Sequence, residues 1–145
     1  LFPYTTLFRS FREAFEAQAL AQLEGLDLAP ELAIDIIASF SEVDAKLIKA
    51  LERLEPIGHS NPAPLFATYG VELVPQSVRI LKERHLSLQL RHNGAVHDAI
   101  GFNMAERFYT EEMPHLLDVA YTPQFNTFRG ETKIQLVLRD LRAAN

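Results

Sequence analysis

The clearest pattern in the sequence is the alternation His85-Leu86-Ser87-Leu88-Gln89-Leu90-Arg91-His92. Leucine occupies every second central position, and polar side chains occupy the positions between. Successive side chains of a β-strand point to opposite faces, so a period of two predicts a strand with one buried and one solvated face. We therefore expect a β-sheet protein whose core includes the three leucines.

Other strands are expected on both sides of this one. One long or broken strand is predicted over 66–80, and three more over 96–102, 117–121 and 132–141. A short helix is predicted over 104–109, and 126–130 has the composition of a hairpin loop in which Gly130 is free to take a positive φ. Five strands with a helix between the third and the fourth predict a five-stranded OB-type barrel.

The part of the chain before the strands is predicted to be mostly helical. Apolar side chains at partial helical spacing predict a helix over 11–23, whereas 32–40 is compatible with either a strand or a helix. Ser41 is predicted to cap a second helix that ends at Pro56, because apolar residues then recur at helical spacing. The expected fold class is mainly β with an N-terminal helical segment.

A cluster of turn-forming residues separates the two parts. Pro56, Gly58, Asn61, Pro62 and Pro64 lie within nine positions, which predicts a rigid linker over 56–64. Gly58 and Asn61 are expected to set a turn and to bind backbone groups. The predicted domains are therefore a helical part over 11–55 and a barrel over 65–145.

The charge is distributed unevenly along the chain. The formal net charge is −5, and residues 11–64 hold 4 basic and 10 acidic side chains, whereas residues 65–145 hold 9 of each. Four cations and two histidines oppose only Glu83 between positions 79 and 92. Such a basic band can bind phosphates, and we predict that Lys82, Arg84 and Arg91 do so. The alternative is an ordinary solvated strand face.

Aromatic side chains could supply stacking surfaces for nucleobases. Phe128 is the best candidate because it lies in a predicted loop beside Arg129, and the others are Tyr109, Tyr121 and Phe125. Phe66 and Phe102 are expected to fill the barrel. His85 either packs at the barrel end or contacts the ligand.

Composition excludes several classes of function. The sequence contains no cysteine, so it has no disulfide, no thiolate zinc site and no thiol catalysis. His85, His92, His97 and Asp98 do not have the spacing of a known metal motif, and we expect no metal site. No apolar run is long enough to cross a bilayer, so a soluble, cytoplasmic protein is expected.

One junction carries a family resemblance. Leu54-Glu55-Pro56-Ile57-Gly58-His59-Ser60-Asn61-Pro62-Ala63-Pro64-Leu65-Phe66 resembles the segment that precedes the OB domain in the RecJ family of single-strand-specific DNA exonucleases. Segments similar to the family's follow in the same order at 82–88, 99–103, 126–130 and 135–142. Ile57 and Ser60 stand where the family has Phe and Gly. The resemblance covers about 51–142, and 11–40 is similar to the end of the family's DHHA1 domain.

The resemblance implies that this chain is a C-terminal fragment of a 5′ to 3′ exonuclease of DNA repair and recombination. The barrel would bind single-stranded DNA, with Lys82, Arg84, His85, Arg91, Phe128 and Arg129 as candidate contacts. Cleavage in the family depends on Mg²⁺ or Mn²⁺ held by an upstream DHH domain, and no Asp-His-His occurs in this sequence. The fragment is therefore predicted to be inactive alone.

The implied partners are single-stranded DNA, the DHH and DHHA1 domains of the same protein, and a single-strand-binding protein. An alternative is that the barrel is mainly a structural or protein-interaction wall.

The first ten residues, Leu1-Phe2-Pro3-Tyr4-Thr5-Thr6-Leu7-Phe8-Arg9-Ser10, match the translation of a common sequencing adapter. We interpret 1–10 as an artefactual adapter-derived segment and expect natural sequence to begin at Phe11. The alternative is a genuine extended N-terminal segment.

Overall fold

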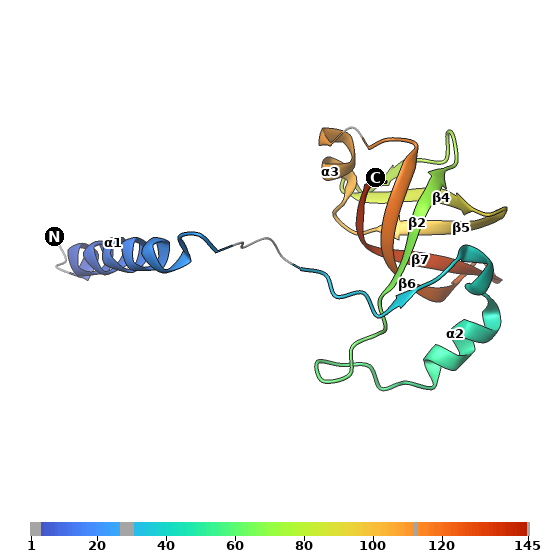
Figure 1. Ribbon diagram of the computed structural model, residues 1–145, viewed down its shortest axis with the longest axis horizontal. Coiled ribbons are helices and arrows are strands. Elements are labelled where there is room, and N and C mark those ends of the chain that lie inside the picture. Colours follow the sequence, from blue (N-terminus) through green and yellow to red (C-terminus); the bar gives the residue numbers. More distant parts are fainter. Residues whose placement is uncertain (1–3, 27–30, 112, 145) are drawn as a thin grey trace. The chain divides into compact units, whose positions relative to one another are not determined.

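The computed structural model describes residues 4–26, 31–111 and 113–144, and the chain divides into two compact units, 1–32 and 33–145. The first unit contains helix α1 (Tyr4–Leu23), which confirms the helix predicted over 11–23 and begins before it (Figure 1). Arg12 Nε lies 2.7 Å from Glu16 Oε1 one turn away, and the rings of Phe11 and Phe15 stack. No helix in the described residues is long and apolar enough to span a membrane.

The second unit is built around one curved sheet. Its strands are β1 (Ile36–Ile37), β2 (Phe66–Leu73), β3 (Arg79–Leu81), β4 (His85–His92), β5 (Ala95–Gly101), β6 (Leu116–Phe128) and β7 (Glu131–Ala143). The order is β1-β2-β6-β7-β5-β4-β3, and a further pairing between β2 and β4 closes a ring of five strands (Figure 1). Helix α3 (Ala105–Thr110) lies between β5 and β6 in the sequence. The predicted OB-type barrel is therefore confirmed.

The alternating leucines point into this ring. Leu86, Leu88 and Leu90 are fully buried, and every residue between them in β4 is less buried. They meet apolar side chains from all the other ring strands, among them Phe66, Val71, Ala99, Leu117, Val119, Tyr121, Leu136 and Leu138. The expectation that Phe66 fills the barrel is confirmed.

The segment before the linker packs on the barrel. It contains β1, the 3-10 helix η1 (Phe40–Glu42) and α2 (Ala45–Glu52). β1 pairs in parallel with the start of β2, and Phe40, Val43 and Ile48 are buried. The residues 32–40, left open by the sequence, thus hold a very short strand and the start of a single 3-10 turn.

The predicted helix cap was wrong by three residues. Asp44, and not Ser41, caps α2: its Oδ1 accepts hydrogen bonds from the backbone N–H groups of Lys46 and Leu47 at 2.9 and 2.8 Å. Ser41 lies one turn earlier, in η1. The helix also ends at Glu52, before the predicted limit at Pro56.

Strand β2 bends at a bulge between Thr68 and Val71. Gly70 lies in this bulge with a φ of 66°, a conformation that favours glycine. Its N–H donates to Asp118 Oδ1 at 3.1 Å, and Arg142 donates to Asp118 Oδ2 at 3.2 Å. The buried carboxylate of Asp118 therefore connects β2, β6 and β7.

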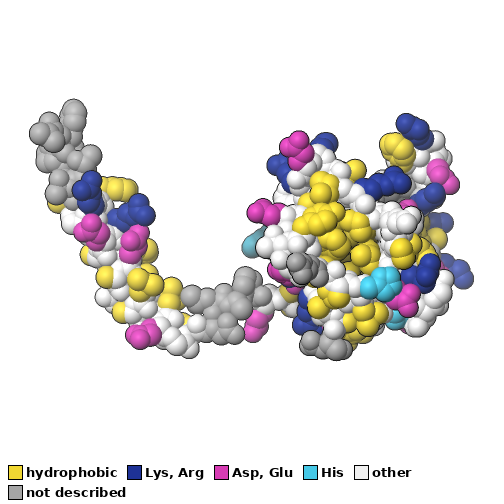
Figure 2. All heavy atoms as spheres, turned by 90° about the horizontal axis from the view of Figure 1, so that it is seen from above, with side chains coloured by type: hydrophobic (Ala, Val, Ile, Leu, Met, Phe, Trp, Pro, Cys, Tyr) yellow, Lys and Arg dark blue, Asp and Glu magenta, His cyan; other side chains and the backbone are white. Residues whose placement is uncertain are grey.

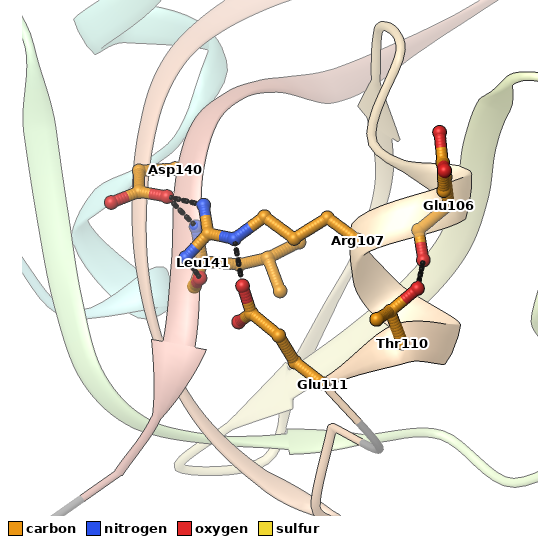
Figure 3. A network of polar contacts seen from close by, with 6 residues as sticks. All are labelled: Glu106, Arg107, Thr110, Glu111, Asp140 and Leu141. Atoms are coloured by element: carbon orange, nitrogen blue, oxygen red, sulfur yellow. Dashed lines mark hydrogen bonds and ion pairs between the residues drawn. The ribbon is translucent and has the colours of Figure 1, made fainter.

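Helix α3 is fastened to β7 by one arginine. Figure 3 shows the guanidinium of Arg107 between the carboxylates of Glu111 and Asp140, and it also donates to the carbonyl of Leu141 at 3.0 Å. The hydrogen bonds to Glu111 and Asp140 raise the pKa of Arg107. The network therefore joins α3 to β7.

Candidate nucleic-acid interface

The outer face of the sheet carries rows of polar side chains across β3, β4, β5 and β7. The register places Arg79 beside Ser87, and Gln89 beside Asp98, which in turn lies beside Gln135. In β4, β5 and β7 these residues stand next to buried positions of their strands, whereas β3 is exposed along its whole length. The polar face predicted from Ser87, Gln89 and Arg91 therefore continues onto the neighbouring strands.

Two hollows lie on this face, and Asp98 borders both. The first has a volume of about 280 Å³ and is lined by Pro75, Gln76, Ser77, Arg79, Ser87, Leu88, Gln89 and Asp98. The second has a volume of about 220 Å³ and is lined by Asp98, Asn126, Phe128, Glu131, Lys133, Ile134 and Gln135. We call this surface the polar groove. It begins at the loop between β2 and β3 and ends at the β6–β7 hairpin.

The loop at the first end is held by Ser77. Its hydroxyl donates to the carbonyl of Val74 at 2.7 Å and accepts from the N–H of Gln89 at 3.0 Å. These bonds join the loop to β4. They therefore hold in place the loop backbone that lines one side of the first hollow.

The hairpin at the second end is longer than the sequence predicted. β6 continues to Phe128 and β7 begins at Glu131, so the turn contains only Arg129 and Gly130, with φ values of 52° and 82°. The predicted loop over 126–130 was therefore too long. Phe128 is 67% exposed, and the guanidinium carbon of Arg129 lies 5.2 Å from the centre of its ring.

The predicted basic band does not form one surface. Lys82 and Glu83, both at positive φ, and Arg84 make the turn between β3 and β4. Arg91 lies near the other end of β4, where its guanidinium is 3.9 Å from Glu72. Figure 2 likewise shows Lys and Arg side chains spread over several parts of the barrel face in view.

His85 and Phe102 form an aromatic pair at the end of β4 and β5 beside that turn. Their ring centres are 5.3 Å apart in an edge-to-face arrangement, and His85 Nδ1 accepts from the N–H of Asn103 at 3.2 Å. Phe102 is 54% exposed, so the expectation that it fills the barrel was wrong. The strand ends at Gly101, and Phe102 follows on the outer side of the sheet.

The remaining stacking candidates differ in their surroundings. Tyr121 has an exposure of 0%, so its assignment as a stacking candidate was wrong. Phe125 borders a separate, mainly apolar hollow of about 310 Å³ between α2 and the β6–β7 hairpin. Tyr109 is exposed on α3, where its ring meets Phe108 edge-on.

The linker residues organise the junction locally. Asn61 Nδ2 donates to the carbonyls of Leu54 and Pro56 at 2.8 and 3.1 Å. Gly58 and Asn61 exchange two backbone hydrogen bonds, and the peptide bond before Pro56 is cis. Pro62 is exposed and Pro64 half-buried, beside the first residues of the barrel.

The histidines weighed as metal ligands have other partners. His92 Nδ1 lies 3.2 Å from Ser39 Oγ and His97 Nε2 lies 3.1 Å from the carbonyl oxygen of Phe40. In residues 4–26, 31–111 and 113–144 no group of three or more His, Asp or Glu side chains is placed to hold a metal ion.

Sequence reasoning did not identify Asp98 or the lysine and glutamine of β7 as parts of one groove. Their alignment depends on the register of Asp98 with Gln135 across strands that are distant in the sequence. The only signal available from the sequence was their polar character at outward positions. Pairing between β5 and β7 had to be known before that signal could be used.

Comparison with known proteins identifies similar chains. The family model of the RecJ OB domain matches residues 34–140. The single-stranded-DNA-specific exonucleases RecJ of Salmonella typhimurium and Escherichia coli are each 26% identical over 136 residues, which is 92% of this chain and 23% of each relative. The chain thus spans about a quarter of the length of these relatives.

Solved structures agree with this match. The crystal structure of RecJ from Thermus thermophilus in complex with Mn²⁺ superposes with a TM-score of 0.71 at 26% identity, over 97% of this chain and 20% of that chain. The Mg²⁺ complex of the same protein gives the same TM-score and covers 21% of that chain.

Proposed function

Because the chain belongs to the RecJ OB domain family, we propose that it binds single-stranded DNA as the C-terminal part of a RecJ-like 5′ to 3′ exonuclease. The observation that carries the proposal is the polar groove. It crosses the outer face of β4 and β5 between two loops, and OB folds bind oligonucleotides on the corresponding strands and loops.

The groove offers what a binder with little sequence preference needs. Arg79 lines the first hollow and Lys133 lines the second, so cations are available to phosphates on both sides. Phe128 is an exposed ring at one end, and the His85–Phe102 pair adds aromatic surface beside Lys82 and Arg84. Arg91 and Arg129 are proposed as further, weaker contacts because neither lines the two hollows.

Cleavage is assigned to the part of the family that this chain does not match. The RecJ of Thermus thermophilus has been solved with Mn²⁺ and with Mg²⁺. We propose that the intact protein uses such an ion in a DHH domain, and that this chain delivers the strand without cutting it. A cytoplasmic role in DNA repair and recombination, and contact with DHHA1 and a single-strand-binding protein, belong to the same proposal.

The test is a titration of the 145-residue chain with labelled single-stranded oligonucleotides at several salt concentrations, read by fluorescence anisotropy. Affinity should fall steeply with salt, and the Arg79→Ala/Lys133→Ala double variant should bind about tenfold or more weakly with a smaller salt slope. Lys49→Ala is the matched control, because Lys49 is an exposed cation on α2 outside the groove. Equal affinities for the double variant and the control would overturn the proposal.

A second candidate function is that of a structural or protein-interaction surface, and the mainly apolar hollow beside α2 favours it. Ile48, Leu51, Ile57, Pro123, Phe125 and Val137 contribute to its lining. Absence of any DNA binding at low salt would favour this alternative.

A further inference from the structure

The polar groove has an unpaired negative charge at its centre. Asp98 borders both hollows, and no Lys, Arg or His in the described residues forms an ion pair with it. Glu131, the other carboxylate that lines the groove, lies 3.2 Å from Lys133 Nζ. The centre and the ends of the groove therefore differ in charge.

The hydrogen bonds of Asp98 leave one acceptor free. Gln89 Nε2 donates to Asp98 Oδ1 at 2.8 Å, which fixes the carboxylate against the sheet. Oδ2 has no protein donor in the described residues. Gln135 lies next to Asp98 across the β5–β7 pair, so the middle row of the groove is Gln89, Asp98 and Gln135.

This arrangement constrains how a DNA strand can lie. A phosphate placed over Asp98 would meet an uncompensated like charge, whereas phosphates at the ends would meet Arg79 and Lys133. A base edge placed over Asp98 can satisfy the free oxygen by donating an N–H. An exocyclic amino group does so at the edge of the base, whereas uracil and thymine offer only N3–H, which lies between two carbonyl oxygens that the carboxylate repels. Acidic side chains accept such a bond from N4 of cytosine.

We infer that Asp98 turns the bases of the bound strand toward the sheet and accepts a hydrogen bond from an exocyclic amino group, which gives the groove a preference for amino-bearing bases over uracil or thymine. This inference rests on the proposed single-strand binding and adds to it the orientation and base preference of the strand. The free oxygen of Asp98 distinguishes one base from another, whereas the cations at the two ends of the groove bind phosphates whatever the base.

The test compares oligo(dC) with oligo(dU) of equal length above neutral pH. The two probes have the same backbone and pyrimidine ring size, and cytosine carries an amino group where uracil carries a carbonyl. The unaltered chain should bind oligo(dC) about fivefold more tightly, a value near the lower end of what one good base contact contributes. Asp98→Asn should bring the ratio close to one, mainly by tightening oligo(dU).

Two variants serve as controls. Glu131→Gln removes a carboxylate from the same groove that is already paired with Lys133, so it should retain the preference. Gln89→Ala keeps the Asp98 carboxylate and frees its second oxygen, so the preference should persist or increase. Loss of the preference in Gln89→Ala would mean that Gln89, and not Asp98, distinguishes the bases, so this variant tests the inference without altering Asp98.

The outcomes distinguish a failure of this inference from a failure of the proposed DNA binding on which it rests. A ratio near one in the unaltered chain, or a ratio unchanged by Asp98→Asn, overturns the role of Asp98 while salt-dependent binding still supports DNA binding. Absence of binding to both probes at low salt overturns the proposed function itself.

Discussion

Tyr121 is fully buried, and its hydroxyl is part of a short chain of hydrogen bonds. It lies 2.9 Å from Thr68 Oγ1, which donates to the carbonyl of Ala38 at 2.7 Å. The chain connects β6, β2 and the segment before α2. Burial raises the pKa of Tyr121, so the folded protein retains the phenolic proton more strongly than the unfolded chain does.

This pKa shift predicts the direction of an alkaline effect. Stability from neutral Tyr121 is complete below the unfolded pKa of about 10 and is lost as pH rises through the higher folded pKa. Tyr121→Phe should lower the free energy of unfolding by about 1–2 kcal/mol at neutral pH. Above pH 10, the free energy of unfolding of this variant should depend less on pH than that of the unaltered chain. Urea unfolding at a series of pH values measures both, and Tyr69→Phe, at an exposed tyrosine, is the control. Parallel pH profiles for the two variants would contradict the expectation.

At the scale of elements, α3 depends on the Arg107 network for its position on β7 (Figure 3). Arg107→Ala should lower global stability by only about 0.5–1 kcal/mol, because the ion pairs are partly exposed. It should nevertheless speed amide hydrogen exchange across α3 severalfold, because the helix would lose its bonds to Asp140 and Leu141. Arg107→Lys keeps the charge but not the planar set of guanidinium donors. Its exchange rate in α3 should lie between those of the unaltered chain and Arg107→Ala. Arg12→Ala, in α1, should leave exchange in α3 unchanged.

The sequence was sufficient for elements whose signal is local. Alternation identified β4, a helical stripe identified α1, and the short helix between the third and fourth ring strands was placed to within one residue. The cap of α2 was misplaced because Ser41 and Asp44 are both good capping residues, and only the backbone geometry distinguishes them. Phe102 was misassigned because its position relative to the end of β5 decides which face it joins.

The candidate site was less predictable than the fold. The outward positions Ser87, Gln89 and Arg91 could be predicted from one strand. Asp98 lies across the β4–β5 hairpin from Gln89, but its neighbour Gln135 could not be predicted, because the pairing of β5 with β7 joins strands that are distant in the sequence. Nearness in sequence was also misleading: Lys82 and Arg91 lie toward opposite ends of β4.

For the whole molecule, the question is where the independently folding barrel begins. The sequence predicted a boundary before Leu65, and that boundary stays a prediction. In the structure, the unit over 33–145 includes Phe40 and Val43 in its core, and Phe40 packs edge-on against Tyr121 and against His92 and His97. The carboxylate of Asp35 also accepts a hydrogen bond from the N–H of Leu65 at 2.8 Å.

Urea unfolding of three shortened chains tests where the independently folding barrel begins. A chain that starts at Ala33 keeps every core residue and should unfold cooperatively with an unchanged midpoint. A chain that starts at Ala45 loses Phe40 and Val43, and one that starts at Leu65 loses Ile48 as well. Loss of a buried phenylalanine alone costs about 3–5 kcal/mol, a large part of the roughly 5–15 kcal/mol that stabilises a domain, so both should be largely unfolded or aggregated. Phe40→Ala in the full chain separates the loss of this side chain from the loss of the segment. If the chain from Leu65 unfolds at the same urea concentration as the chain from Ala33, then the segment before it is dispensable and the sequence-predicted boundary is the physical one.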